Sequence, residues 1–296
     1  MRKACIGINF PDYCGPMDIS GTLEIISNSG FDAVELALDV YPLIIGGEIN
    51  HKYVNYVQKA FEKFPLQYTG HIGSGVNLRN LENLEIQKSI LKSSIEICSI
   101  LSLSILTVHF EEASLVTREE QTFMDGYIEA AQYAAEMGVM LCMENIEVEH
   151  YTKVLDMVKK VDLDNFKMNL DLGHLYLSCS YFGLDFEKAV VECAPYTRHI
   201  HLQDNTGDFE KMRLTDFPRY KTMSMTHRIA FGKGDVHLPP FWGKAPLKWS
   251  LERIFEAGFN GIVLCEYGGA VYRPFDREIQ QDVRNTVNDI LKRLKA

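Results

Sequence analysis

The chain has 296 residues, of which 46% are hydrophobic and 24% are charged, an ordinary composition for a globular protein with one large domain or two smaller ones. Its formal net charge of −10 disfavours a general surface for nucleic acid or anionic membranes. It has no run of about 18 apolar residues that would predict a membrane span, no signal-peptide pattern at its N-terminus, and seven cysteines without a C-x-x-C pair, which together indicate a cytoplasmic protein.

Eight apolar runs of β-type residues recur along the chain, at a spacing of about 35 residues. Between them lie amphipathic runs with apolar residues at three- and four-residue steps, which predict helices. Several of these end in glycine just before the next apolar run, as helix C-termini often do. We expect strands at 5–10, 33–39, 66–72, 105–110, 139–146, 166–172, 198–204 and 261–267.

Eight repeated β-α units over 1–296 predict an α/β protein with a single (β/α)8 barrel domain. A doubly wound open sheet is the alternative, but no G-x-G-x-x-G motif follows the first predicted strand. One connection is long: residues 205–246 separate the seventh and eighth strands. Loops of this length in a compact domain are usually functional.

Polar side chains of metal-binding types stand at the ends of the predicted strands, where a (β/α)8 barrel has its active site. Because side chains alternate along a strand, His71 shares a face with Thr69, and Glu144 shares one with Cys142. If that face points inward, six side chains converge on the barrel mouth. These are His71, His109, Glu144, Asp171, His201 and Glu266. Glu35 lies midway along the second strand and is expected to contact the substrate or to support the ligands.

Several carboxylates in one dry site would repel each other and take up protons unless a cation neutralised them. We therefore expect one divalent ion at the mouth of the barrel. Three carboxylates and one imidazole favour manganese, with magnesium, zinc and cobalt as alternatives. The expected ligands are Glu144, Asp171, His201 and Glu266. His71 and His109 either bind a second metal or donate hydrogen bonds to a substrate.

Other polar residues near the strand ends are expected to assist. The turn after Asp171 places His174 beside the mouth, where it can reach a substrate oxygen or a second ion. His199 should lie one layer deeper, in an orienting or core role. Asn145 and Asp204 are candidates for orienting the ligands. Three more histidines are expected at the surface or in loops: His51, His150 and His237.

The motifs MENI, LDLGH, HIHLQDN, FGKGD and CEYGG follow one another as in the xylose-isomerase-like superfamily, which this chain resembles from its first strand to its last. In ketose 3-epimerases of this superfamily a Glu, Asp, His, Glu quartet binds one metal, often manganese, and the four expected ligands match it by position. The resemblance implies that Glu144 and Glu266 also form an acid–base pair. One removes a proton next to a carbonyl and the other returns it, through an enediolate.

The resemblance therefore implies a metal-dependent isomerase or epimerase that acts on a small sugar or sugar phosphate. An inosose-type dehydratase shares this chemistry and is an alternative. A zinc-dependent apurinic endonuclease or phosphodiesterase is another, because its ligand set also matches His71, His109 and His174. That branch needs an Asp-x-His pair after the seventh strand, where this chain reads Thr226-His227-Arg228. A complete three-metal site, and a nucleic-acid substrate, are therefore disfavoured.

The loop 206–246 holds seven Lys or Arg residues against four acids, a local positive patch on an acidic chain. It is either a solvated lid or a contact for a phosphate-bearing or acidic substrate, with Arg228 as a charge partner. Trp242 in the same loop is expected either to cap a sugar face or to anchor the loop. Many relatives are dimers or tetramers, so a homo-oligomer is an expectation that no sequence feature specifies.

Overall fold

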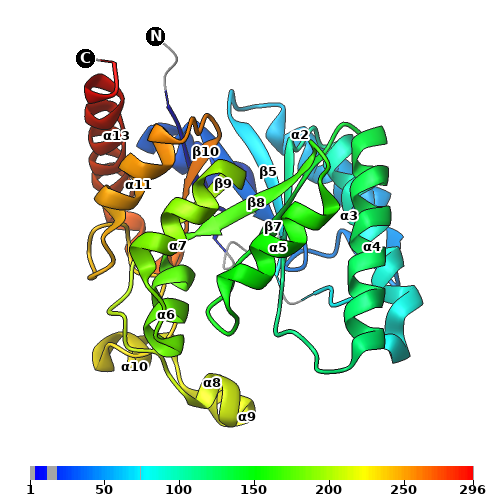
Figure 1. Ribbon diagram of the computed structural model, residues 1–296. Helices are drawn as coiled ribbons and strands as arrows, with labels where there is room; N and C mark the ends of the chain where they lie inside the picture. The colour runs from blue at the N-terminus through cyan, green and yellow to red at the C-terminus, as the bar shows by residue number, and fades with distance from the viewer. Residues whose placement is uncertain (1–3, 12–18, 74, 296) are drawn as a thin grey trace.

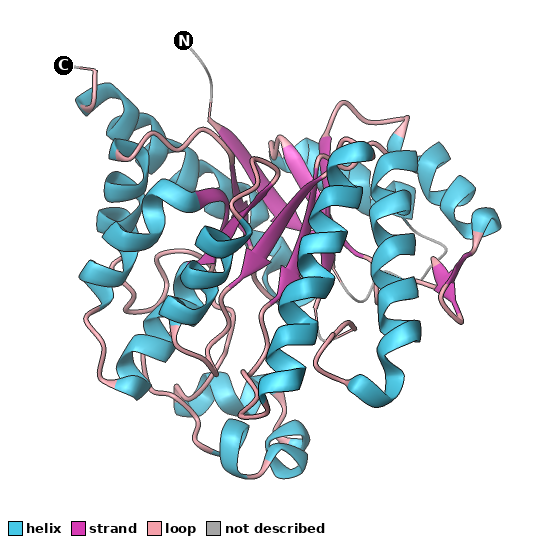
Figure 2. Ribbon diagram, turned by 45° about the vertical axis from the view of Figure 1, so that its right-hand side comes forward, coloured by secondary structure: helices cyan, strands magenta, loops and turns pink. Residues whose placement is uncertain are grey.

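Eight parallel strands close into a barrel in the order β1-β10-β9-β8-β7-β6-β5-β2 (Figure 2). The computed structural model describes residues 4–11, 19–73 and 75–295. Every barrel strand begins and ends within two residues of an expected one, and the predicted (β/α)8 barrel is confirmed. The strands are β1 (Cys5–Asn9), β2 (Ala33–Ala37), β5 (Gln67–Ile72), β6 (Ile105–His109), β7 (Met140–Glu144), β8 (Phe166–Asp171), β9 (Thr197–Leu202) and β10 (Ile262–Cys265).

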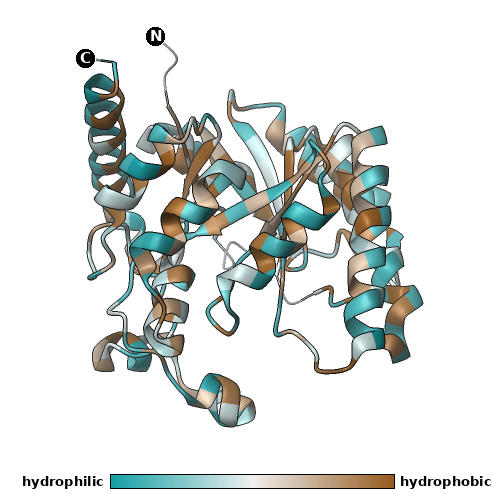
Figure 3. Cartoon of the chain, in the orientation of Figure 1, coloured by the Kyte–Doolittle hydropathy of each residue, from teal (hydrophilic) through white to brown (hydrophobic). Residues whose placement is uncertain are grey.

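Helices surround this barrel, with apolar faces toward the strands and polar faces outward (Figure 3). The longer ones are α1 (Ile19–Ser29), α2 (His51–Phe61), α3 (Leu84–Ile100), α4 (Thr117–Glu136), α5 (Tyr151–Val161), α6 (Leu172–Phe182), α7 (Phe186–Cys193), α11 (Leu247–Glu256) and α13 (Asp276–Arg293). Short elements fill the connections: β3 (Ile44–Ile45), β4 (Glu48–Ile49), α12 (Gly269–Tyr272), and the 3-10 turns η1 (Leu81–Asn83), η2 (Ala194–Tyr196) and η3 (Arg273–Phe275).

The long connection between β9 and β10 carries three short helices on the side of the barrel opposite the chain termini (Figure 1). They are α8 (Met212–Thr215), α9 (Phe217–Thr222) and α10 (Met225–Phe231). Pro218 stands in the first turn of α9, and α10 ends at Gly232, whose φ of +62° suits glycine. The expected loop is therefore a partly helical cover over the mouth of the barrel.

The interior of the barrel is layered. An apolar floor consists of Ala33, Ile105, Cys142, Ile262 and Leu264, separate from the larger core between strands and helices. Above it lies a layer of buried polar side chains, and above that come the polar strand ends. The middle layer contains Glu35, Thr69, Thr107, Asn169 and His199. Buried polar groups are costly without partners, so the middle layer demands a specific network.

Two further expectations concern the chain as a whole. Among the described residues, no helix is long and apolar enough to cross a membrane. The described cysteines are thiols, and five of them are buried. Burial raises the pKa of these thiols above the ordinary value, which keeps them in the less reactive protonated form. Cys14 lies outside the described residues.

We predict that Leu264→Ala lowers the free energy of unfolding by about 3 kcal/mol, because it opens a cavity in the floor of the barrel. Chemical denaturation followed by circular dichroism measures this value. The matched control is Leu115→Ala, which makes the same change at a fully exposed side chain and should shift stability by less than about 0.5 kcal/mol. Equal effects of the two substitutions would contradict the layered interior.

Candidate metal centre

Four side chains from neighbouring strands meet at the mouth of the barrel. Glu144 ends β7, Asp171 ends β8, His201 lies on β9, and Glu266 directly follows β10. One ligand-type atom from each lies within 4.8 Å of the other three, and all four residues are buried. Nδ1 of His201 lies 3.1 Å from Oε2 of Glu266 and 3.3 Å from Oε2 of Glu144. The structure thus brings together the four residues expected as ligands.

Four buried polar atoms of this quartet, one from each residue, lack hydrogen-bond partners among the described residues. They are Oε1 of Glu144, Oδ2 of Asp171, Nδ1 of His201 and Oε2 of Glu266. Buried polar atoms are rarely left unpaired in native structures. Three carboxylate oxygens and one imidazole nitrogen converging in this way form a donor set for a divalent cation. The quartet therefore fits the metal that its residue types predict.

The acid–base state of the quartet reflects the same concentration of charge. Burial raises the pKa of Asp171 to about 7, opposed by the charge of His174 and assisted by those of Glu266 and Glu144. Burial also raises the pKa of Glu266, but the charges of His201 and His237 outweigh it and bring the pKa down to about 2. The positive charges that hold Glu266 ionised come from imidazoles, and a cation would perform the same role.

Hydrogen bonds from the protein fix the orientation of the carboxylates. Asn169 Nδ2 donates to Glu144 Oε2 at 2.9 Å. Asp171 caps α6 and accepts from the backbone N–H of His174 at 2.6 Å, so one of its oxygens is held by the helix and the other faces the quartet. Asn145 Nδ2 donates to the Asp171 carbonyl, and the Asp171 N–H donates back to Asn145 Oδ1. Asn145 thus holds the backbone of Asp171, one of the expected ligands, and Asn169 holds the carboxylate of Glu144, a contact that the sequence pattern did not indicate.

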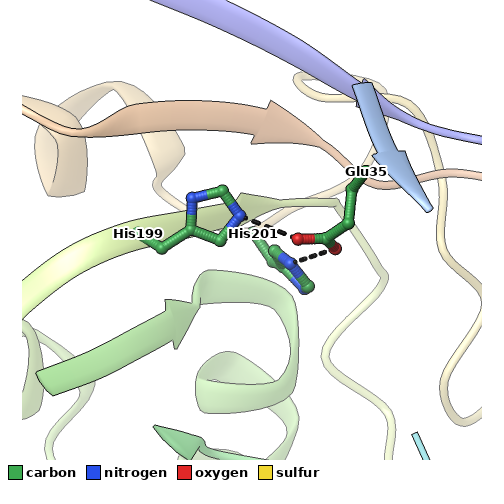
Figure 4. A group of neighbouring side chains, drawn as sticks. All are labelled: Glu35, His199 and His201. Carbon is green, nitrogen blue, oxygen red and sulfur yellow. Dashed lines mark hydrogen bonds and ion pairs between the residues drawn. The ribbon is translucent and has the colours of Figure 1, made fainter. Parts of the chain in front are cut away.

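Below the quartet, Glu35 joins the two histidines of β9 (Figure 4). Its Oε1 lies 2.8 Å from Nε2 of His201, and its Oε2 lies 3.0 Å from Nε2 of His199. Thr69 Oγ1 also donates to Oε2 at 2.9 Å. Contact with Nε2 of His201 leaves Nδ1 beside Glu144 and Glu266, which is the arrangement that orients a histidine ligand. Glu35 was expected to contact substrate or support the ligands, and these contacts favour support.

His71 and His109 form a second group that shares Glu144 with the quartet. Their Nε2 atoms lie 3.0 Å apart, and they lie 3.4 Å and 3.8 Å from Oε2 of Glu144. Two imidazole nitrogens at this separation can share a proton or converge on a metal ion. Burial lowers the pKa of His71, but the hydrogen bond and charge of Glu144 raise it to about 9.

A third group contains His174, Asp235 and His237. Nε2 of His237 lies 3.0 Å from Asp235 Oδ2, and Nε2 of His174 lies 3.5 Å from Oδ1. His237 also approaches the quartet, with Nδ1 3.7 Å from Glu266 Oε2. His237 lies in the long loop, as expected, and this loop carries it to the centre, a position that was not expected. An Asp-x-His pair is present after all, because Asp235-Val236-His237 follows the glycines of FGKGD instead of preceding them.

Two cavities open onto this centre, of about 340 Å³ and 440 Å³, and both are lined by His71, Asp235, His237 and Glu266. Arg228 lines the larger one. Trp242 lines neither of them: it is 45% exposed and packs edge-on against Tyr272 and Phe275, so the structure does not bring it to the centre. Of the other two histidines, His51 begins α2 and His150 packs against Phe182.

Asp204 has a different role from the one expected. Its carboxylate accepts backbone N–H groups of Asn205, Gly243 and Ala245 and touches none of the quartet. Its own backbone bridges to Leu238 in both directions at 2.9 Å. Asp204 therefore pins the returning end of the long loop beside β9, which carries the neighbouring Asp235 and His237 to the centre.

A family model described as xylose isomerase-like TIM barrel matches residues 23–288. The chain belongs to this family. Among the curated proteins, none matches the chain.

Many solved structures share the fold. A xylose isomerase-like TIM barrel protein from Mycobacterium smegmatis, in complex with magnesium, superimposes with a TM-score of 0.71 at 16% identity, over 98% of this chain and 100% of that one. An L-ribulose 3-epimerase superimposes with a TM-score of 0.68 at 13% identity, over 99% of this chain and 97% of that one. The 3-keto-D-glucoside 4-epimerase from E. coli superimposes with a TM-score of 0.65 at 14% identity, over 94% of this chain and 100% of that one. At these identities the likeness establishes the fold.

We predict that Glu35→Gln weakens the binding of a divalent ion by about 10- to 100-fold, because the imidazole of His201 loses the carboxylate that orients it. Titration calorimetry of the chelator-treated protein with Mn²⁺ measures the affinity. Asp39→Asn is the control: Asp39 lines the smaller cavity but forms no group with the ligands. If Glu35→Gln binds Mn²⁺ as tightly as the wild type, Glu35 does not orient His201 for metal binding.

Proposed function

We propose that the protein is a metal-dependent isomerase or epimerase that moves a proton on a sugar or sugar phosphate through an enediolate. The observation that carries this proposal is the quartet: four buried ligand-type atoms from four successive strand ends, within 4.8 Å of one another. The likeness to an L-ribulose 3-epimerase and a 3-keto-D-glucoside 4-epimerase supports a sugar as substrate. The magnesium complex of another relative supports a divalent ion.

Glu144 and Glu266 are the proposed acid–base pair. Both reach the same Nδ1 of His201 on β9, Glu266 from the adjacent strand β10 and Glu144 from β7 on the other side, beyond β8, so a substrate at the centre would meet a carboxylate on each side. One carboxylate removes the proton from the carbon next to the carbonyl, and the other returns a proton to the opposite face. A bound divalent ion would polarise that carbonyl and so acidify the neighbouring C–H.

The imidazoles around the quartet are proposed to hold the substrate oxygens. His71 and His174 lie against opposite oxygens of Glu144, at 3.4 Å and 3.3 Å. His71, His109 and His174 all line the larger cavity, whose volume falls in the usual range for small-molecule sites. A sugar in this cavity would present hydroxyl groups to several ring N–H donors, which would fix the carbon that lies next to the catalytic carboxylates.

A phosphodiesterase of apurinic endonuclease type is the second candidate, and one specific observation favours it. His71 and His109 with Glu144, the quartet itself, and His174 with Asp235 and His237 are three adjoining metal-type groups. Glu144 belongs to the first two. If zinc occupied all three groups, a phosphodiesterase would become the better-supported function and the isomerase or epimerase the second candidate. Incubation of the zinc-loaded protein with abasic DNA tests this candidate, and intact DNA would exclude it.

The test of the main proposal is proton exchange with solvent. We predict that the manganese-loaded protein transfers deuterium from D₂O into at least one member of a panel of ketoses, aldoses and their phosphates, read by mass spectrometry. Glu144→Gln should lower the exchange rate by about 10²- to 10⁴-fold, the usual contribution of a general acid–base group. Its circular dichroism spectrum should be unchanged, because glutamine fills the same volume.

The control for this test is Glu112→Gln, the same change at an exposed carboxylate in the loop after β6. It should keep the wild-type exchange rate. If no sugar in the panel acquires deuterium, the proposed reaction is wrong. If exchange occurs but survives in Glu144→Gln, the reaction stands and the assignment of Glu144 is wrong.

A further inference from the structure

One half of the larger cavity is built by the short helices α8–α10, and this half is cationic. Arg213, Lys221 and Arg228 line it together with the rings of Phe217 and Tyr220. The other half is the centre described above, so a single ligand in the cavity can touch both. The sequence pattern singled out Arg228 as a charge partner, but Arg213 and Lys221 were counted only among the seven cations of the loop.

The charge of Arg213 is already balanced. Its Nε lies 2.7 Å from Oε1 of the buried Glu147, and its guanidinium lies over the ring of Phe217 at 4.8 Å. This ion pair ties α8 to the segment after β7, because Arg213 and Glu147 lie 66 residues apart in the chain. Arg213 is therefore part of the cavity wall, and the net charge of this half comes from the other two cations.

Arg228 is held in place but not neutralised. Its Nη1 donates to the hydroxyl of Tyr220 and, at 2.7 Å, to the carbonyl of Asp235, and its guanidinium lies 4.9 Å from the Tyr220 ring centroid. Its Nε is buried without a hydrogen-bond partner, and no described carboxylate forms an ion pair with it. A fixed guanidinium that lines the cavity and has no carboxylate partner among the described residues is suited to an anionic oxygen.

Lys221 supplies the second uncompensated charge. It lies on α9, four residues after Phe217, and its Nζ stands 4.6 Å from the centroid of that ring. It is exposed, and among the described residues it also has no carboxylate partner. Two unpaired cations on one cavity wall match the charge of a phosphate monoester, which is close to −2 at neutral pH.

We propose that the substrate is a phosphorylated sugar, whose phosphate is bound by Arg228 and Lys221 while its carbonyl end lies at the quartet. This inference rests on the proposed function, because it names the substrate class for the same site. A monoester fits better than a nucleic acid. Specific DNA-binding proteins neutralise about 6–10 phosphates, whereas this wall offers two unpaired cations on a chain of net charge −10.

The first arm of the test measures binding and does not depend on turnover. The probe is inorganic phosphate, titrated by calorimetry into the metal-loaded wild type and into Arg228→Gln and Lys221→Gln. Each substitution removes a charge-assisted contact and should weaken phosphate binding about tenfold. Any phosphate that binds the metal itself contributes equally to all variants. Lys211→Gln is the matched control, because Lys211 lies in the same loop but does not line the cavity.

Of the two substitutions, Lys221→Gln tests the phosphate site with less risk of disturbing the loop. Arg228 also anchors the Asp235 carbonyl, so its loss could disturb the loop, whereas Lys221 contacts only the face of a ring. If both variants bind phosphate as tightly as Lys211→Gln, the phosphate site is wrong. If both weaken and the control does not, the site is correct, whatever reaction the protein catalyses.

The second arm compares sugars with and without phosphate in the deuterium-exchange assay. We expect the ratio of kcat/KM for phosphorylated sugars to kcat/KM for unphosphorylated ones to fall about tenfold in Arg228→Gln and Lys221→Gln, and to keep its wild-type value in Lys211→Gln. Exchange that occurs equally well with and without phosphate would overturn the inference and leave the proposed function standing. Absence of any exchange, with phosphate binding still sensitive to Arg228, would instead overturn the proposed function alone.

Discussion

The crowding of negative charge at the mouth of a dry barrel is the constraint on which this structure depends. Glu144, Asp171 and Glu266 are buried there, and each has one carboxylate oxygen without a hydrogen-bond partner in the described chain. Desolvation opposes all three charges, and their mutual repulsion adds to it for Asp171, whose pKa rises to about 7. Such an arrangement persists in a folded protein when a positive charge meets it, and the surrounding imidazoles and a divalent ion both supply one.

The rest of the barrel is organised to hold these carboxylates in place. The apolar floor stabilises the fold. Polar side chains of the middle layer above it contact the expected ligands and hold them in one orientation. Glu35 links β2 to both histidines of β9, and Asn169 links β8 to Glu144 on β7. Asp171 serves simultaneously as the N-cap of α6 and as a ligand-type group. The quartet is therefore held by residues of the strands and their ends, which fix a site more precisely than loops do.

The sequence predicts the barrel and the quartet because both follow from local patterns. In a strand that is apolar on both faces, the first charged residue, such as Glu144 or Glu266, marks the end of the strand and is at the same time a metal-binding residue type. The third group could not be found in this way. Asp235 and His237 lie in the long loop, and contacts of that loop with Asp204, among them the bridge to Leu238, bring them back to β9. Arg213 and Trp242 illustrate the same limit, since one enters the cavity wall and the other packs outside it through contacts made far along the chain.

The central claim is that the quartet holds a divalent ion, and the metal content of the purified protein tests it most directly. Elemental mass spectrometry should find one manganese or similar ion per wild-type chain, and that ion should be lost in Asp171→Asn, which keeps the cap of α6 but removes the ligand charge. Two or three zinc ions per chain would place metals at His71, His109 and His237 as well, and would favour the phosphodiesterase. A wild-type chain that binds no divalent ion, even after incubation with manganese and zinc, would contradict the account.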